Sequence, residues 1–199
     1  GQQIRKSDVK IYAEEKELSI FQPLNLKDDS FITQMKDLNA DVFIVVAFRM
    51  LPAVVWKIPP MGTINLHASL LPDYRGAAPI NWAIMNGEKT TGVTTFFINE
   101  VIDTGDIIKR KSTEIHSEMT AGDLHDQLMS IGGDLISETL KELVDGKTNR
   151  ENQILDESST LNAAPKIFKN DCKIDWANSL DEVYNKIRGL SPYPGAWCI

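Results

Sequence analysis

Residues 41–47 read DVFIVVA and residues 63–72 read TINLHASLLP, and these two runs decide the architecture of the chain. The first run is apolar and β-branched almost throughout, which is typical of a strand buried on both faces of a parallel sheet. The second begins as a short apolar strand, in which side chains two residues apart share a face. Asn65 and His67 therefore point the same way, and they place an amide beside an imidazole.

A carboxylate is the natural third member of this group. Asp103-Thr104-Gly105-Asp106 lies between β-rich runs at residues 91–98 and 106–115, which are close enough to pair through that loop. A carboxylate beside His67 would fix the tautomer of the ring and stabilise its cation. An amide, an imidazole and a carboxylate that converge on one carbonyl suit the transfer of an acyl group to an amine. Either short motif alone is more often structural, because Asp and Gly favour turns.

The remaining pattern predicts an α/β domain. Thr120 and Asp123 form a candidate capping box at the start of a long helix that ends at Gly146. Other helices are expected at residues 8–16, 27–38, 77–85 and 179–190, and a short strand at 19–22. The first helix would turn Val9, Tyr12 and Ala13 inward. The long helix has one apolar stripe, formed by Leu124, Leu128, Ile131, Leu135, Leu140, Leu143 and Val144. The last helix has Leu180, Val183, Tyr184, Ile187 and Leu190 spaced for burial. Alternating strands and helices predict a Rossmann-like, mostly parallel sheet flanked by helices.

Composition narrows the class of protein. The chain has 199 residues, of which 42% are hydrophobic and 25% charged, as in soluble globular proteins. A net charge of -7 argues against a basic coat, so the charge that contacts a nucleic acid would have to be local. No apolar run approaches the roughly 20 residues of a membrane helix. Cys172 and Cys198 fit neither a metal site nor a disulfide framework, so a reducing cytosol is the simplest compartment.

Other common chemistries lack their motifs. The sequence has no Gly-x-Gly-x-x-Gly and no Gly-Lys-Ser/Thr loop, which leaves a dinucleotide or ATP role without support. His, Cys and carboxylate residues do not occur at metal-ligand spacing. No Gly-x-Ser-x-Gly elbow surrounds a serine, so Ser69 need not be a nucleophile.

Four motifs in one order carry a family resemblance. The chain resembles the folate-dependent formyltransferases in NLHASLLP at 65–72, YRGAAPI at 74–80, TGVT at 91–94 and DTGD at 103–106. Within this family, the chain is more similar to the branch that acts on methionyl-tRNA than to the purine-pathway enzymes. The motifs that favour this branch are APKI at 164–167, IDW at 174–176 and IRGLSPYPGAW at 187–197. The resemblance covers nearly the whole chain.

The resemblance also implies how the chain is organised. Residues 1–150 would be part of a formyltransferase catalytic domain, incomplete at the N-terminus because a strand–helix–strand unit has no counterpart. Residues 151–199 would be a polar loop, a helix and a linker leading to an absent C-terminal barrel domain of the oligonucleotide-binding type. The chain would then represent the middle of such an enzyme.

The implied reaction moves a formyl group from 10-formyltetrahydrofolate to the amino group of methionine on initiator tRNA. Asn65, through its amide NH2, and protonated His67 would stabilise the charge that grows on the formyl oxygen. Asp103 would keep His67 charged and help move a proton from the amine to the folate nitrogen. Folate is a co-substrate in this scheme, and no metal is implied.

Motif matching also assigns the binding residues. The folate pocket would draw on Phe48 to Pro52, including Met50 and Leu51, and on Glu100, Val101, Ile102, Ser69, Leu70, Leu71 and Pro72. The Leu71–Pro72 bond is a candidate cis peptide. Arg5, Lys6 and Arg75 would contact tRNA, although a solvated role is at least as common for such residues. The enzyme would be a cytosolic monomer with no membrane partner.

Three alternatives share the same residues. An enzyme that formylates an amino-sugar nucleotide would use the same trio. A hydrolase of formyltetrahydrofolate would use it with water as the acceptor. The chain would otherwise be a folate-binding module without turnover.

Overall fold

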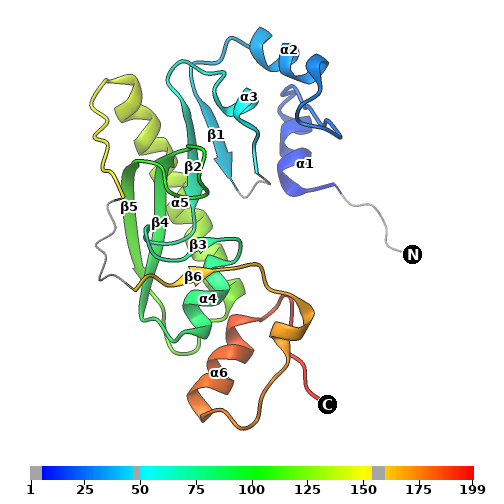
Figure 1. Cartoon of the computed structure of the whole chain (residues 1–199), viewed down its shortest axis with the longest axis vertical. Coiled ribbons are helices and arrows are strands. Elements are labelled where there is room, and N and C mark those ends of the chain that lie inside the picture. The colour runs from blue at the N-terminus through cyan, green and yellow to red at the C-terminus, as the bar shows by residue number, and fades with distance from the viewer. Residues whose placement is uncertain (1–5, 47–49, 154–159) are drawn as a thin grey trace.

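The computed structural model describes residues 6–46, 50–153 and 160–199. Figure 1 shows a mixed α/β arrangement in which the long helix α5 runs the length of the sheet. The helices are α1 (Asp8–Glu15), α2 (Asp29–Asp37), α3 (Ala53–Trp56), α4 (Pro79–Met85), α5 (Ala121–Val144) and α6 (Leu180–Gly189), with a 3-10 turn at Lys169–Cys172. The strands are β1 (Phe43–Val46), β2 (Thr63–His67), β3 (Arg75–Gly76), β4 (Thr90–Phe97), β5 (Ile107–Glu114) and β6 (Ala163–Ala164).

The main sheet has the strand order β1-β2-β4-β5. β1 pairs with β2 in parallel, whereas β2–β4 and β4–β5 are antiparallel. The α/β class is confirmed, but the described sheet is mixed rather than mostly parallel. For the β4–β5 pair the physical reason is its short connection, because a short loop joins antiparallel strands and a parallel crossover needs a dozen or more residues.

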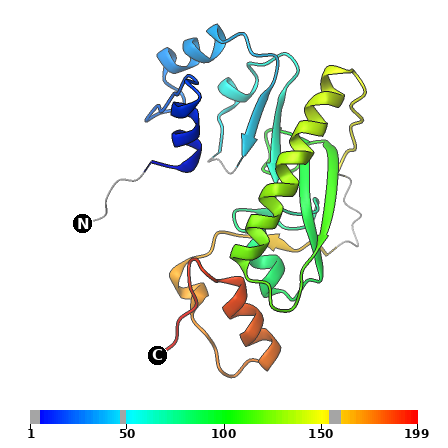
Figure 2. The ribbon, with the colours of Figure 1, turned by 180° about the vertical axis from the view of Figure 1, so that it is seen from behind.

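Helix α5 covers one face of this sheet (Figure 2). Its predicted capping box is confirmed, since Asp123 N–H donates to the Thr120 hydroxyl and Thr120 N–H donates to the Asp123 carboxylate. The buried face includes Leu124, Leu128, Leu135 and Leu143, four of the residues in the apolar stripe read from the sequence. The opposite face of β2 and β4 is therefore left for the functional side chains.

A second, two-stranded sheet ties residues 163–164 to the loop that follows β2. β3 pairs in parallel with β6, with Arg75 opposite Ala163 and Gly76 opposite Ala164. Gly76 has a φ of 130°, and a Cβ there would collide with the Ala164 carbonyl group. Only glycine allows this close approach of two backbones.

Three local expectations are wrong. Helix α1 forms, but Val9 and Tyr12 are exposed and only Ala13 is half-buried. Residues 19–22 form no strand. In α6, Val183 is half-buried whereas Leu180, Tyr184 and Ile187 are exposed, although Leu190 directly after the helix is fully buried. Periodicity identified these helices correctly, but it does not show which neighbouring element covers an apolar face.

Among the described residues, no helix combines the length and the apolar composition needed to span a bilayer.

Candidate active site

Strand β2 brings Asn65 and His67 to one face of the sheet. Asn65 lies opposite Phe96 and His67 lies opposite Thr94 on antiparallel β4. Directly opposed residues of an antiparallel pair share a face, so these four side chains line the side away from α5. The intervening Leu66 points to the α5 side, where a Cβ on Gly132 would collide with it. Alternation along the strand thus puts Asn65 and His67 on the same face, as the sequence predicted.

His67 is buried between two oxygen atoms. Its Nε2 lies 2.8 Å from the backbone oxygen of Tyr74, and its Nδ1 lies 3.8 Å from Oδ2 of Asp103. A carbonyl oxygen only accepts, so Nε2 must carry a proton. Nδ1 is then the nitrogen that faces the carboxylate, and the predicted proximity of Asp103 to His67 is confirmed.

The loop between β4 and β5 presents Asp103. Asn99 Oδ1 accepts from Val101 N–H at 2.9 Å and from the Thr104 hydroxyl at 3.0 Å, which folds the loop back on itself. Asp103 adopts a left-handed backbone with a φ of 55°, a conformation that Asp tolerates better than most residues. Its Oδ2 accepts from the Gly76 backbone N–H at 3.0 Å. This bond and the turn aim the carboxylate at His67.

Thr94 anchors the loop that follows β2. Its buried hydroxyl donates to the Ser69 backbone oxygen at 2.6 Å and accepts from Leu71 N–H at 3.1 Å. The Ser69 hydroxyl donates to the Asp73 backbone oxygen at 2.6 Å, so its proton is already engaged. Arg110 adds a bond to the Leu71 carbonyl at 2.8 Å. The Leu71–Pro72 bond is cis.

A cleft of about 1200 Å³ opens beside these residues. Its wall includes Asn65, His67 and Asp103 together with Met50, Leu51, Phe96 and the 98–102 loop. Asn65 Oδ1 is a buried oxygen with no hydrogen-bond partner among the described residues. A buried acceptor left unpaired costs about 1–3 kcal/mol, so this atom calls for a donor from a ligand. The apolar wall with a few converging polar groups fits a flat ring with a polar edge, such as a pterin.

The binding residues expected from the motifs divide into two groups. Met50, Leu51, Glu100, Val101 and Ile102 line the cleft. In contrast, Ser69, Leu70, Leu71 and Pro72 are not part of its lining, and Ser69 and Leu71 are buried in their own loop. Phe48 and Arg49 fall outside the described residues. The direct folate role of these two groups stays a prediction.

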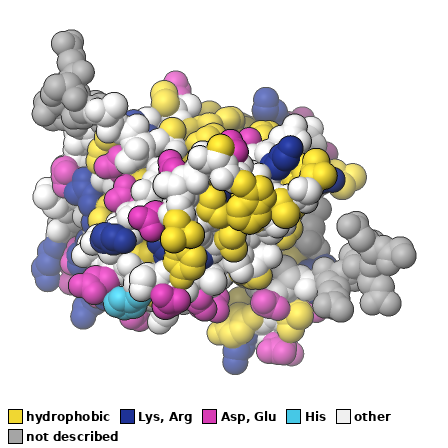
Figure 3. Space-filling model, turned by 90° about the horizontal axis from the view of Figure 1, so that it is seen from below, with side chains coloured by type: hydrophobic (Ala, Val, Ile, Leu, Met, Phe, Trp, Pro, Cys, Tyr) yellow, Lys and Arg dark blue, Asp and Glu magenta, His cyan; other side chains and the backbone are white. Residues whose placement is uncertain are grey.

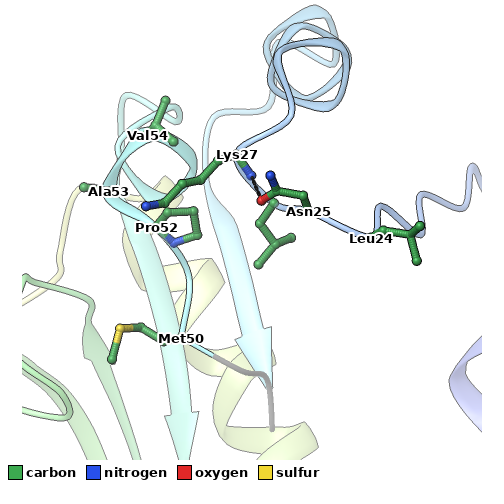
Figure 4. A pocket seen from close by; sticks show the side chains of 8 residues that line it. Leu24, Asn25, Lys27, Met50, Pro52, Ala53 and Val54 are labelled. Atoms are coloured by element: carbon green, nitrogen blue, oxygen red, sulfur yellow. Dashed lines mark hydrogen bonds between the residues drawn. The ribbon is translucent and has the colours of Figure 1, made fainter.

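A second, more open hollow of about 670 Å³ shares Met50, Pro52 and Ala53 with the cleft. Figure 4 shows the Lys27 side chain extending toward Pro52 and Ala53 from the loop before α2. The dashed line is the bond from Lys27 N–H to Asn25 Oδ1, at 3.0 Å. Among the described residues, Lys27 is the one titratable residue in the wall of this hollow.

Figure 3 views the molecule from below, the end that carries α6 in Figure 1, and shows hydrophobic side chains gathered among acidic ones. Exposed hydrophobic residues of the last segment are Phe168, Trp176, Leu180, Tyr184, Ile187, Tyr193 and Ile199. Lys169 and Lys173 lie over the Trp197 ring, 6.0 and 5.8 Å from its centroid. None of these residues lines the cleft.

In the described ranges, no group of three or more His, Cys, Asp or Glu residues is arranged to hold a metal ion.

Sequence reasoning missed three contributors to the site. They are the Tyr74 carbonyl, the Thr94 hydroxyl and the Gln153 amide, which donates to the Asp103 backbone oxygen at 3.1 Å. A backbone carbonyl carries no signal in a sequence. Thr94 would have been found from the β2–β4 register, whereas nothing local distinguishes Gln153 from a solvated loop residue.

Together the fold and the site define an α/β domain with an amide–imidazole–carboxylate centre of the acyl-transfer type. Residues 1–140 match the family model described as formyl transferase, and residues 166–199 match the one described as formyl transferase, C-terminal domain. The chain belongs to the formyl transferase family.

Relatives with curated names agree with this assignment. A methionyl-tRNA formyltransferase of Flavobacterium psychrophilum is 57% identical over 198 residues, which cover 100% of this chain and 62% of that protein. One from Parabacteroides distasonis is 50% identical, covering 99% and 61%. The chain thus spans about three fifths of the length of these relatives.

Solved structures agree on the fold. HypX from Aquifex aeolicus, in complex with tetrahydrofolic acid, has a TM-score of 0.74 and 22% identity, covering 95% of this chain and 33% of that one. A 4-N formyltransferase from Francisella tularensis has a TM-score of 0.73 and 22% identity, covering 96% and 76%. At this level of identity the likeness is evidence for the fold alone.

Proposed function

We propose that this chain carries the catalytic part of a methionyl-tRNA formyltransferase, a cytosolic enzyme that moves a formyl group from 10-formyltetrahydrofolate to the amino group of methionyl initiator tRNA. The observation that carries the chemistry is His67, buried at the cleft between a carbonyl oxygen and the Asp103 carboxylate. The choice of acceptor is supported by the relatives that are 50–57% identical over nearly the whole chain and bear that name.

In this proposal His67 acts as a hydrogen-bond donor to the formyl oxygen. Nε2 stays bonded to the Tyr74 carbonyl, so Nδ1 is the working nitrogen. When it is protonated, Nδ1 donates to the formyl oxygen as negative charge develops there, and one such donor contributes roughly 3 kcal/mol in other acyl-transfer sites. Asp103, 3.8 Å away, stabilises the imidazolium.

Asn65 positions the two reacting groups through hydrogen bonds. Its unpaired Oδ1 accepts a hydrogen of the attacking amine, while its NH2 group is available to the formyl oxygen. The amine nitrogen forms a bond to the formyl carbon, the bond from that carbon to the folate nitrogen breaks, and the amine proton passes to the folate nitrogen. Folate supplies the activated formyl group, and Met50, Leu51 and the 98–102 loop form the apolar wall against which it would bind.

The proposed tRNA contacts are Arg5, Lys6 and Arg75. Arg5 lies outside the described residues. Lys6 is exposed and paired with Glu14 at 2.7 Å, an interaction that is worth little at a surface and is easily exchanged for a phosphate. Arg75 donates through Nε and Nη2 to Gln153, so it would reach tRNA only through the rest of its guanidinium. We propose a monomer, because Asn65, His67 and Asp103 of one chain meet at the cleft.

The test supplies formyl-labelled 10-formyltetrahydrofolate to the full-length protein with charged initiator tRNA, with an amino-sugar nucleotide, or with no acceptor. The expected product is labelled formylmethionyl-tRNA. Label on the sugar would instead identify a sugar N-formyltransferase, and formate released without an acceptor would identify a hydrolase. Folate binding with no product in any mixture would leave only a binding module, and each of these three results would overturn the proposal.

A further inference from the structure

Residues 151–153 lie against the start of β5 and the loop that precedes it. Ile107 and Glu151 exchange both backbone hydrogen bonds at 2.8 Å, which makes an isolated antiparallel bridge. The Glu151 carboxylate also receives two bonds from Arg110, at 2.8 and 2.9 Å. This short stretch, which we term the strap, is therefore fixed by both its backbone and its side chain.

The strap buries Gln153, whose side chain is bonded at both ends. Its Oε1 accepts from Nε and Nη2 of Arg75 at 3.1 and 2.5 Å. Its Nε2 donates to the backbone oxygens of Asp103 and Gly105 at 3.1 and 2.8 Å. A glutamine amide has two N–H groups and one carbonyl with two lone pairs, so these four bonds use its full capacity. At 8% exposure, the residue has little contact with solvent.

These bonds connect the two segments that set the position of the catalytic carboxylate. Gln153 holds the backbone on both sides of Thr104 and also holds Arg75, the residue before Gly76. Gly76 N–H in turn donates to the Asp103 carboxylate at 3.0 Å. Asp103 is thus held by its backbone through Gln153 and by its side chain through Gly76, and Gln153 also accepts hydrogen bonds from Arg75, the residue before Gly76.

The charge at this point favours an amide over a charged side chain. Gln153 Nε2 faces two carbonyl oxygens, which a carboxylate would repel. Burial lowers the pKa of the Arg75 guanidinium, and the negative charge of Asp103 opposes that shift. Because Gln153 is neutral, it does not neutralise the positive charge of Arg75, and that charge still attracts the Asp103 carboxylate.

We infer that Gln153 is a positioning residue for formyl transfer, acting by holding Asp103 at its distance from His67. This inference rests on the proposed function for its kinetic consequence, but its structural consequence is independent of any substrate. Loss of the Gln153 bonds frees the backbone at Asp103, and displacement of a catalytic group by about 1 Å is enough to cost on the order of 100-fold in rate.

The experiment compares Gln153→Met and Gln153→Glu with wild type in the full-length protein. Methionine keeps the length of the side chain and removes all four bonds, whereas glutamate keeps the Arg75 contact and removes only the two bonds to the loop. Gln127→Met is the matched control, because Gln127 is a half-buried glutamine that joins α5 to Thr113 on β5, away from the site. Each protein is assayed for kcat and KM and for amide hydrogen exchange.

We expect both Gln153 variants to lose about 100-fold in kcat, with KM values for both substrates within about threefold of wild type. Exchange at the Gly76 amide should speed up at least about tenfold while the β4 amides keep their protection, since only local opening increases. Gln127→Met should change neither the rate of amide exchange at Gly76 nor kcat.

Two outcomes would overturn the inference. One is unchanged Gly76 exchange in both Gln153 variants, and the other is a uniform rise in exchange across β4, which would mark a general structural role. If Gly76 exchange rises as expected but wild type forms no formylmethionyl-tRNA, the proposed function fails while the positioning role stands. Should Gln153→Met not fold, Gln153→Glu carries the same test.

Discussion

The Nε2 atom of His67 lies 2.8 Å from the backbone oxygen of Tyr74, on the side of the ring opposite to Asp103. Tyr74 itself has a positive φ of 58° and a buried side chain whose hydroxyl donates to Glu88 at 2.6 Å. The turn that supplies the carbonyl is therefore anchored at a second point. This contact decides which nitrogen of His67 faces the chemistry.

The first prediction concerns this tautomer. Because the Tyr74 oxygen accepts only, neutral His67 should carry its proton on Nε2, with an unprotonated Nδ1 toward Asp103. Nitrogen-15 NMR of the labelled ring at a pH where it is neutral checks this directly. A spectrum of the Nδ1–H form would show that the arrangement is incorrect.

The second prediction concerns the carboxylate. Asp103→Asn keeps an oxygen that accepts from Gly76 N–H but loses the negative charge beside His67. Formyl transfer should fall by about 10²–10⁴-fold in kcat, the range expected for loss of acid–base assistance. His67→Ala should fall at least as far. Circular dichroism and the thermal midpoint should stay close to those of wild type, and near wild-type rates in either variant would refute the assigned roles.

The third prediction uses two adjacent threonines that face opposite sides of β4. Thr94→Val leaves Leu71 N–H and the Ser69 oxygen without their buried partner, at about 1–3 kcal/mol of unfolding free energy for each. It should also lower kcat, because the loop after His67 loosens. Thr95→Val removes a bond to Thr139 on the α5 side, so it should cost stability without changing kcat. Denaturant unfolding and steady-state kinetics measure the two effects, and equal kinetics in both variants would contradict the anchoring role of Thr94.

The fourth prediction concerns Gly76. Gly76→Ala places a Cβ against the Ala164 carbonyl and strains a φ of 130°. Gly146→Ala is the control, since its φ of 68° is also positive but no atom lies within 4 Å of the added Cβ. The control should lose only about 1–2 kcal/mol of unfolding free energy, the cost of a left-handed residue. Gly76→Ala should lose more, and a similar loss in the two variants would argue against the close β3–β6 contact.

The fifth prediction is a pH dependence of the strap. Hydrogen bonds from Arg110, and then its charge, lower the pKa of Glu151. A carboxyl with a lowered pKa in the folded protein adds stability above its ordinary pKa and loses that contribution as the pH falls through the folded value. Glu151→Gln should therefore be less stable than wild type at neutral pH, and the gap should close as the pH falls below about 4, under the ordinary Glu pKa. Thermal midpoints measured from pH 7 to pH 3 test this, and a gap that widens on acidification would contradict it.

Much of the architecture followed from local sequence. The β-branched run at residues 41–47 contains β1, the capping box at Thr120 starts α5, and the runs around Asp103 form the β4–β5 hairpin. These features are set by side-chain period and by hydrogen bonds between neighbours, both of which a sequence displays. The shared face of Asn65 and His67 followed from the same rule of alternation.

Other features needed contacts between distant residues. The sequence did not show that Leu180 and Tyr184 would be exposed, nor that the strap would cross to the Asp103 loop. Gln153 lies 50 residues after Asp103, and its bonds depend on the Ile107–Glu151 bridge that places it there. The domain boundary at residue 150 stays a prediction, and Glu151 and Ala163–Ala164 pair with the start of β5 and with β3 on its other side.

The sequence by itself determined which chemical groups are present and which side of β2 they occupy, because strand geometry repeats every two residues. Only the tertiary structure decided that Asp103 approaches Nδ1 of His67 and that the Tyr74 carbonyl accepts a hydrogen bond from Nε2. It also decided that Gln153 holds the loop that carries Asp103. These relationships depend on backbone atoms and on loops brought together by the sheet, and the energy of a hydrogen bond depends on distances that no local pattern encodes.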